Sequence, residues 1–393
     1  MSRLAPLALL LLACGTADAE PVVSIRRNGP DENRVNIAIL GDGYAQGDQV
    51  KYSSDVDRLV QAMFEQAPYQ RYAPYFNVNR VDVVSAESGA SHPASGVRRN
   101  TALGAEFDCA GIQRLVCVNT GAVNTIVSRS LPSVARDIVV VLVNDPEYGG
   151  SGGSFTVLST HTAAVELLLH ESGHSFGLLG DEYETTPPPC VNTVEPPQPN
   201  IAREIGRDRL KWAAWVDAAT PLPTSAPGSV GAYEGALFCA SGLFRPTQNS
   251  KMRSLGVPFE AVNAEQLIRR IYNFVSPVDS SEPAAPSLAP ARGAAVEFSV
   301  QPMQPASEPL LTTWRVDGAV TATGTSFRLQ SAFLAAGTHT VEVAVVDSTS
   351  AVRNDPGGLL TGRRTWTLSV QASTADDVKR ALEDVFTRWR NPR

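Results

Sequence analysis

Three residues in the segment 165–183 have the types and the spacing that bind and activate a metal ion. His170 and His174 are four residues apart, so on a helix their imidazoles leave the same face one turn from each other. Glu171 lies beside them, where it can accept a proton from zinc-bound water. The pattern therefore predicts one catalytic Zn2+ ion, with His170 and His174 as ligands and Glu171 as the general base.

The flanking residues indicate a helix that ends soon after the histidines. An apolar run, Val165 and residues 167–169, is typical of the buried part of such a helix, and Gly177 lies where the chain must leave it and turn back. Zinc needs a third protein ligand and one open position for water or substrate. Asp181, which follows Gly180, is the nearest candidate for that ligand.

A chance match in a solvated surface helix is the alternative explanation for this pattern. The apolar flank and the acidic residues after the glycine turn argue against it. Histidine is also scarce, because the chain has 5 in total and His161, His170 and His174 lie close together. We therefore interpret the segment as a zinc site.

The motif HESGHSFGLLGDEY, preceded by DIVVVLVNDPEYGGSGG and followed downstream by SKMRS, is similar to that of IgA-peptidase-type zinc metallopeptidases, the igalysin branch of the metzincins. The resemblance extends over roughly residues 30–275. It implies an α/β (α+β) metzincin-like catalytic domain that acts as a zinc-dependent endopeptidase on a protein or peptide substrate.

The resemblance also bears on the third ligand, which is usually histidine in metzincins. Gly180 occupies that position here, so the resemblance makes Asp181 the ligand and leaves Glu182 as a rival. Neighbours in an extended segment point to opposite sides, so only one can face the histidines. We expect Asp181 to bind zinc and Glu182 to orient a ligand histidine. Tyr183 and His161 are further candidates for the cleft or for a supporting role, and His161 could equally have a structural role at the start of the helix.

By resemblance, Met252 is the methionine of the Met-turn, whose thioether forms an apolar floor beneath the zinc ion without binding it. Most metzincins have a tyrosine two residues later, whereas this chain has Ser254, which argues against help from a tyrosine at that position. The resemblance further implies that residues 150–158 form the edge of a sheet and pair with an extended substrate.

The N-terminal residues 1–19 have the arrangement of a secretory signal, with one arginine, an apolar run and then small residues. Two processing routes remain open: cleavage after Ala19, or lipid attachment at Cys14, which would give a lipid anchor. Both routes predict a secreted, periplasmic or cell-surface protein.

The remaining four cysteines are an even number, which suits an oxidising compartment. We expect the disulfides Cys109–Cys117 and Cys190–Cys239, with free buried thiols as the alternative. The formal net charge is -7 and no basic cluster occurs, which argues against a nucleic acid partner.

The length of 393 residues favours more than one domain. The catalytic domain is predicted at 20–275. Its periodicity predicts a strand, a helix and a second strand, followed by a buried strand, an irregular stretch and a closing helix. The expected ranges are 35–40, 56–64, 76–84, 137–143, 217–248 and 265–274.

Residues 276–292 are rich in proline and are predicted to be a linker without packed structure. Alternating strands separated by glycine turns then predict an immunoglobulin-like β-sandwich at 293–372. Its expected strands are 296–300, 311–316, 326–329, 338–346 and 364–370. A C-terminal helix is predicted in 373–393.

Two other functions fit parts of the sequence. A surface-binding or adhesion protein could retain a degenerate peptidase domain as a scaffold, although every catalytic residue type is present. A zinc hydrolase of cell-wall or glycan substrates could use the same metal site.

Overall fold

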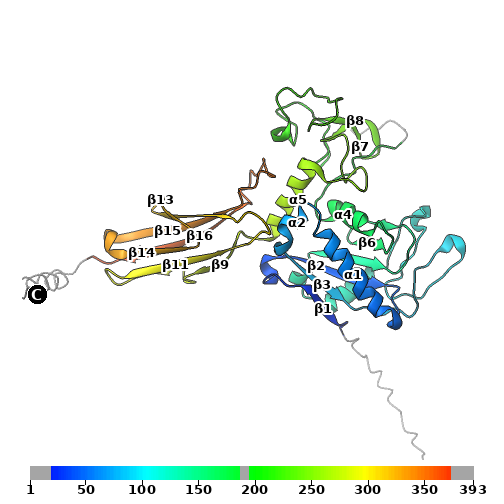
Figure 1. Cartoon of the computed structure of the whole chain (residues 1–393), viewed down its shortest axis with the longest axis horizontal. Helices are drawn as coiled ribbons and strands as arrows, with labels where there is room; N and C mark the ends of the chain where they lie inside the picture. Colours follow the sequence, from blue (N-terminus) through cyan, green and yellow to red (C-terminus); the bar gives the residue numbers. More distant parts are fainter. Residues whose placement is uncertain (1–18, 186–193, 373–393) are drawn as a thin grey trace, which may run out of the picture.

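The computed structural model describes residues 19–185 and 194–372, which form two parts lying side by side (Figure 1). Cys14 and Cys190, most of the predicted signal, and the predicted helix in 373–393 lie outside the described residues. Within the described ranges, no helix is long and apolar enough to cross a membrane.

The first part is built on a mixed sheet of six strands in the order β1-β3-β2-β4-β6-β5. Strands β2, β3, β4 and β6 are parallel, and β1 and β5 are antiparallel to their neighbours. This order confirms the predicted strand–helix–strand unit. The strands are β1 (Val22–Arg26), β2 (Val35–Asp42), β3 (Phe76–Val81), β4 (Ile138–Val143), β5 (Gly150–Ser151) and β6 (Thr156–Ser159).

Strand β2 is buried along its whole length, because both faces of the sheet are covered. Ile37 and Ile39 belong to a core that includes residues of three helices, α1 (Gln49–Met63), α4 (Ala164–Ser175) and α5 (Glu260–Phe274). Ala38 and Leu40 belong to a second core with residues of α3 (Thr120–Ser130) and of the loop 103–116. Alternate residues of β2 thus point to opposite faces of the sheet and pack in two different cores.

A hairpin of β7 (Tyr233–Ala236) and β8 (Cys239–Arg245) forms within the stretch predicted to be irregular, 217–248. That prediction was wrong for these residues, because the turn between the strands is built by Leu237 and Phe238 in left-handed conformations. Without glycine or asparagine at those positions the usual hairpin signal is missing from the sequence.

The second part contains a five-stranded sheet, β10-β16-β15-β12-β13, and a three-stranded sheet, β14-β11-β9. Aromatic residues of the two sheets pack together, with the rings of Phe298 and Trp366 5.0 Å apart. The strands are β9 (Val278–Glu282), β10 (Ser287–Leu288), β11 (Ala295–Pro302), β12 (Leu311–Val316), β13 (Ala319–Thr323), β14 (Ser326–Gln330), β15 (Gly337–Val346) and β16 (Thr361–Val370).

The expected linker at 276–292 is therefore corrected. Strand β9 pairs with β11, and β10 pairs with β16, so this segment supplies one edge strand of each sheet. Its prolines do not oppose pairing, because Pro277, Pro283 and Pro286 lie just outside the strands and not within them.

The two parts meet at α5 and at α2 (Tyr69–Tyr72) (Figure 1). A buried carboxylate lies at this contact. Asp347, which follows β15, is 4% exposed and accepts hydrogen bonds from the hydroxyls of Tyr72 and Tyr272 at 2.7 and 2.8 Å. Arg71 donates to the same carboxylate at 3.0 Å. A buried charge with three donors fixes the contact geometry between the parts.

Candidate metal centre

Helix α4 carries three of the predicted site residues. Its residues Leu168 and Leu169 are buried in the core, whereas His170, Glu171 and His174 face a cavity that Leu167 also lines. The helix ends where Gly177 passes close to Gly173: a Cβ at Gly177 would lie 2.6 Å from the carbonyl oxygen of Gly173. Glycine is therefore required for the turn that brings residues 179–185 back to the histidines.

The turn brings Asp181 to His170 and His174, as the sequence predicts. The Nε2 atoms of the two histidines are 3.1 Å apart, and Oδ1 of Asp181 lies 3.3 Å from His170 Nε2 and 3.2 Å from His174 Nε2. Ligands bound tetrahedrally at about 2.0–2.1 Å from a metal lie about 3.3–3.4 Å apart. The spacing of the three atoms therefore fits a single ion.

The polar environment of these atoms supports the same fit. Oδ1 of Asp181 is buried and accepts no hydrogen bond from any described residue. Burial acts to raise the pKa of Asp181, but interactions with His170 and His174 outweigh it and leave that pKa well below its usual range. Because Oδ1 accepts no hydrogen bond from the described residues and faces both Nε2 atoms, it is placed to bind a cation together with them.

Each histidine is oriented by a backbone carbonyl. Nδ1 of His170 donates to the oxygen of Lys251 at 2.9 Å, and Nδ1 of His174 donates to the oxygen of Leu179 at 2.8 Å. The proton on Nδ1 leaves the Nε2 lone pair free for a metal in the neutral imidazole. Two loops far apart in the sequence thus set the tautomer of both histidines.

Glu171 lines the same cavity and lies against the glycine segment 150–153. A Cβ at Gly152 would be 2.3 Å from Oε2 of Glu171, so a larger residue at this position would displace the carboxylate. Burial raises the pKa of Glu171, and the charges of His170 and His174 oppose the rise. A raised pKa moves a carboxylate towards the range of a general base.

Glu182 does not contact a histidine, so the prediction that it orients a ligand histidine directly was wrong. Its side chain is fully buried and accepts hydrogen bonds from Asn200 at 2.9 Å, Ser250 at 2.7 Å and Asn263 at 2.8 Å. Ser250 Oγ also accepts from the amide of Met252. Glu182 therefore fixes the loop that carries the Lys251 carbonyl, and its influence on His170 is indirect.

Met252 is fully buried beneath α4. A Cβ added to Gly173, which lies between the two histidines on the helix, would be 2.5 Å from its sulfur. Ser254, which stands where most metzincins have a tyrosine, lines the cavity.

Tyr183 lines the cavity, but His161 does not. Partial burial and the neighbouring Asp181 carboxylate raise the pKa of Tyr183. His161 accepts a hydrogen bond from the amide of Ala163 at 3.1 Å and packs edge-on against Tyr148. Of its two predicted roles, the structural one at the start of α4 is the one observed.

The expectation that residues 150–158 form a free edge for substrate is corrected for Gly150. Its amide donates to the oxygen of Arg114 at 3.1 Å, and its carbonyl accepts from the amide of Val116 at 3.5 Å. Strand β6 lies between β4 and β5 and is not an edge. The loop 109–117 therefore covers the outer side of β5, and Gly150, Ser151 and Gly152 are the residues of this segment that line the cavity.

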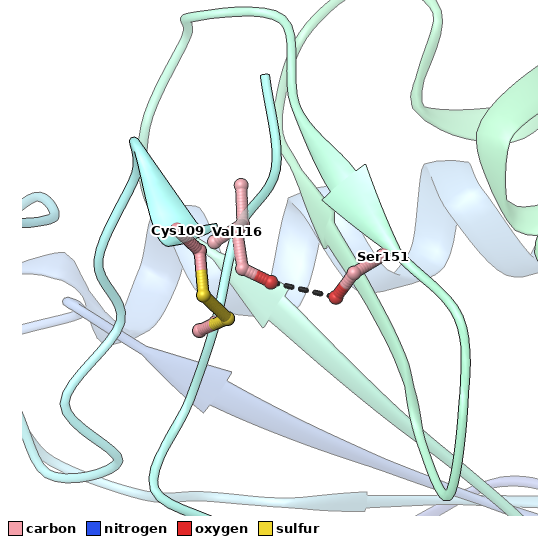
Figure 2. Close-up of a disulfide and its surroundings, with 4 residues drawn as sticks. Cys109, Val116 and Ser151 are labelled. Atoms are coloured by element: carbon pink, nitrogen blue, oxygen red, sulfur yellow. Dashed lines mark hydrogen bonds between the residues drawn. A yellow bond between two sulfur atoms is a disulfide. The ribbon is translucent and has the colours of Figure 1, made fainter. Parts of the chain in front are cut away.

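The disulfide Cys109–Cys117 closes this loop, as predicted (Figure 2). Beside it, Ser151 Oγ donates to the oxygen of Val116 at 2.6 Å. Cys239 also takes part in a disulfide, whereas its predicted partner, Cys190, lies outside the described residues.

The sequence interpretation missed several residues that shape the site. The Lys251 and Leu179 carbonyls and Arg114, which lines the cavity, were not singled out. The sequence did mark the segment that contains Arg114, because this residue lies between Cys109 and Cys117, which were predicted to form a local disulfide. The cavity has a volume of about 520 Å3, and its lining includes Ile112, Arg114, Tyr148, Ser151, Gly152, Phe238, Arg253 and Leu255.

Residues 23–227, just over half of the 393-residue chain, match the family model described as IgA Peptidase M64. The matched range includes α4 and Asp181, and Met252 lies beyond it. No curated protein gives a significant match to the chain.

Two solved structures share a weak likeness with the chain. A quinonprotein alcohol dehydrogenase-like protein from Bacteroides thetaiotaomicron is 15% identical over 22% of this chain and 17% of its own, with a TM-score of 0.16. This chain thus spans only a small part of that protein. Fibronectin(III)-like modules of CbhA from Clostridium thermocellum are 11% identical over 24% of this chain and 98% of their own, with a TM-score of 0.17. TM-scores this low carry no argument about fold or function.

Proposed function

Because the chain belongs to the IgA peptidase M64 family and is therefore a peptidase, we propose that it is a zinc-dependent endopeptidase. The observation that carries this proposal is the convergence of His170 Nε2, His174 Nε2 and Asp181 Oδ1 beside Glu171 in one cavity. Two nitrogen ligands, one carboxylate and space for a further ligand are typical of catalytic zinc.

When bound, zinc would supply a Lewis acid for the scissile carbonyl and lower the pKa of water from about 15.7 towards about 7. Glu171 takes the proton from the attacking water and returns it to the leaving amine nitrogen. Gly152 lies against Glu171 and keeps that carboxylate accessible from the cavity. The carbonyls of Lys251 and Leu179 hold the Nδ1 protons of the two histidines throughout.

The finer structural assignments belong to the same proposal. A metzincin-like catalytic domain is supported by the turn after α4 and by Met252 packed beneath Gly173 as an apolar floor. An immunoglobulin-like sandwich is supported by the two sheets of 278–370 packed through aromatic residues. Export to an oxidising compartment is supported by the Cys109–Cys117 disulfide.

A cleavage assay tests the function. The purified full-length chain is incubated with a denatured protein, with and without a chelator, and the products are sequenced by mass spectrometry. Internal cleavages that the chelator abolishes and added zinc restores are the expected result. An intact protein substrate would refute the proposal, and release of sugars from cell-wall material instead would favour a glycan hydrolase.

A further inference from the structure

The loop 109–117 forms a fixed wall of the metal-site cavity. Its disulfide joins the two ends, and three backbone or hydroxyl hydrogen bonds attach it to Gly150 and Ser151 of β5 (Figure 2). The loop packs closely against Gly149, because a Cβ added there would lie 2.7 Å from Val116 and 3.0 Å from the oxygen of Arg114. The backbone from which side chains of this loop reach the cavity is therefore held in place.

Arg114 is the loop residue that brings charge to the cavity. Its side chain is exposed and lines the cavity with Glu171 and Tyr183, and its charge acts to lower the pKa of both. Throughout residues 19–185 and 194–372, no carboxylate lies within ion-pair distance of Arg114. The guanidinium is thus available to a ligand.

Arg253 lines the same cavity but is already bound. Its guanidinium donates two hydrogen bonds to Glu184, one of them at 2.7 Å, and a third to the oxygen of Glu182 at 2.8 Å. The two arginines therefore differ, because Arg253 is held by ion pairing and hydrogen bonds in the cavity wall, whereas Arg114 has no carboxylate partner among the described residues.

We propose that Arg114 binds a carboxylate of the peptide substrate, so that the cavity prefers peptides with an acidic group close to the scissile bond. Guanidinium groups bind carboxylates through two parallel hydrogen bonds. Ile112 and Phe238, which are 48% and 50% exposed beside the cavity, would contact apolar residues next to that acidic group. The carboxylate can be an Asp or Glu side chain or the C-terminus of the peptide. This inference deepens the proposed peptidase function and rests on it.

A binding experiment tests the proposal without relying on turnover. Zinc-loaded Glu171→Gln protein is titrated with fluorescent, C-terminally amidated peptides that are neutral or carry one Glu scanned through each position. A parallel arm uses the neutral peptide with a free C-terminus. At least one carboxylate-bearing peptide should bind roughly tenfold more tightly than the neutral amide, as a charge-assisted pair provides.

Adding Arg114→Ala to the same protein should abolish that preference, and Arg114→Glu should reverse it in favour of a Lys-containing peptide. Arg98→Ala is the matched control, because Arg98 is 68% exposed, pairs with Glu106 and does not line the cavity. It removes the same charge and should keep the preference. Preference for the free C-terminus alone would support the proposal with the α-carboxylate as the ligand.

Equal affinity for all peptides, or a preference that survives Arg114→Ala, would overturn the proposal. Either result is distinguishable from failure of the proposed function, which is tested separately by cleavage with the unmodified protein. A chain that cleaves peptides but shows no effect of Arg114 would be a peptidase in which Arg114 does not bind the substrate.

Discussion

Nδ1 of His170 donates a hydrogen bond to the backbone oxygen of Lys251, 2.9 Å away and 81 positions later in the chain. The side chain of Lys251 turns back to the same helix, where its ammonium pairs with Glu166. Glu166 also accepts a hydrogen bond from the amide of Gly256 at 2.6 Å. Helix α4 and the loop 250–256 therefore hold each other at two points one turn apart, and the orientation of the His170 imidazole depends on both.

We expect Glu166→Gln to weaken zinc binding although Glu166 is not a ligand. Lys251 is 2% exposed, so loss of its partner leaves a buried charge unpaired and should lower the free energy of unfolding by about 2 kcal/mol. Denaturant unfolding and zinc titration measure the two effects. Glu32→Gln is a suitable control because Glu32 is exposed. Unchanged zinc affinity in the Glu166 variant would show that the ion pair does not position the Lys251 carbonyl.

Glu171→Gln should keep zinc and lose peptidase activity. The amide preserves the shape of the side chain beside Gly152 but cannot accept the proton of water, so kcat should fall by about 100- to 10,000-fold. The measurements are steady-state cleavage of a peptide and metal content of the same sample. Comparable turnover in this variant would assign the base to another residue.

Asp181→Ala and Glu182→Ala should have different consequences, because the adjacent carboxylates have different partners. Asp181→Ala removes an atom that converges with the histidines, and we expect zinc to be lost with little change in stability. Glu182→Ala removes the acceptor of three buried hydrogen bonds, so unfolding should become easier by about 2 kcal/mol.

Zinc affinity in the Glu182→Ala protein should fall by about 10- to 100-fold at most, since its effect passes through Ser250 and the loop. Isothermal titration with zinc and denaturant unfolding separate these outcomes. Zinc retained by Asp181→Ala and lost by Glu182→Ala, with the fold intact, would reverse the ligand assignment.

Acid should weaken the pair between Glu184 and Arg253. Hydrogen bonds from Arg253 lower the pKa of Glu184 from its ordinary 4.5 to about 2. A lowered folded-state pKa contributes stability above pH 4.5, and this contribution is lost as the pH falls from about 4.5 towards 2. Because Glu184 is 37% exposed, solvent screening limits the contribution to about 0.5–1 kcal/mol.

The measurement is the difference in unfolding free energy between the native chain and Glu184→Gln across this pH range. The difference should be present at pH 6 and should shrink towards pH 2. A constant difference would mean that the charge of Glu184 contributes nothing.

Local features of the site could be predicted from the sequence, whereas its supporting contacts could not. The spacing of His170 and His174 is fixed by helical geometry, and Asp181 follows by a turn of few residues, so short-range rules suffice. The Lys251 carbonyl is a backbone group, and nothing in the local sequence marks which carbonyl will face His170. Glu182 was misassigned for a related reason, since its donors on Asn200, Ser250 and Asn263 come from distant segments.

In the fold too, elements with a local sequence pattern could be predicted, whereas long-range pairings could not. The apolar run of β4 and the alternation of β15 and β16 predict strands, because burial and pairing leave a pattern in the residues themselves. Strands β9 and β10 leave no such pattern, as they are edge strands bracketed by prolines. The pairing of loop 109–117 with Gly150 is likewise a long-range backbone contact, and it changes which part of the glycine segment faces the cavity.

The zinc content of the purified full-length chain tests the central claim most directly. Protein prepared in metal-free buffer and then titrated with zinc should bind one ion per chain, measured by elemental analysis, and His174→Ala should remove it. A chain that contains no zinc and takes up none on titration would contradict the assignment of His170, His174 and Asp181 as a metal centre.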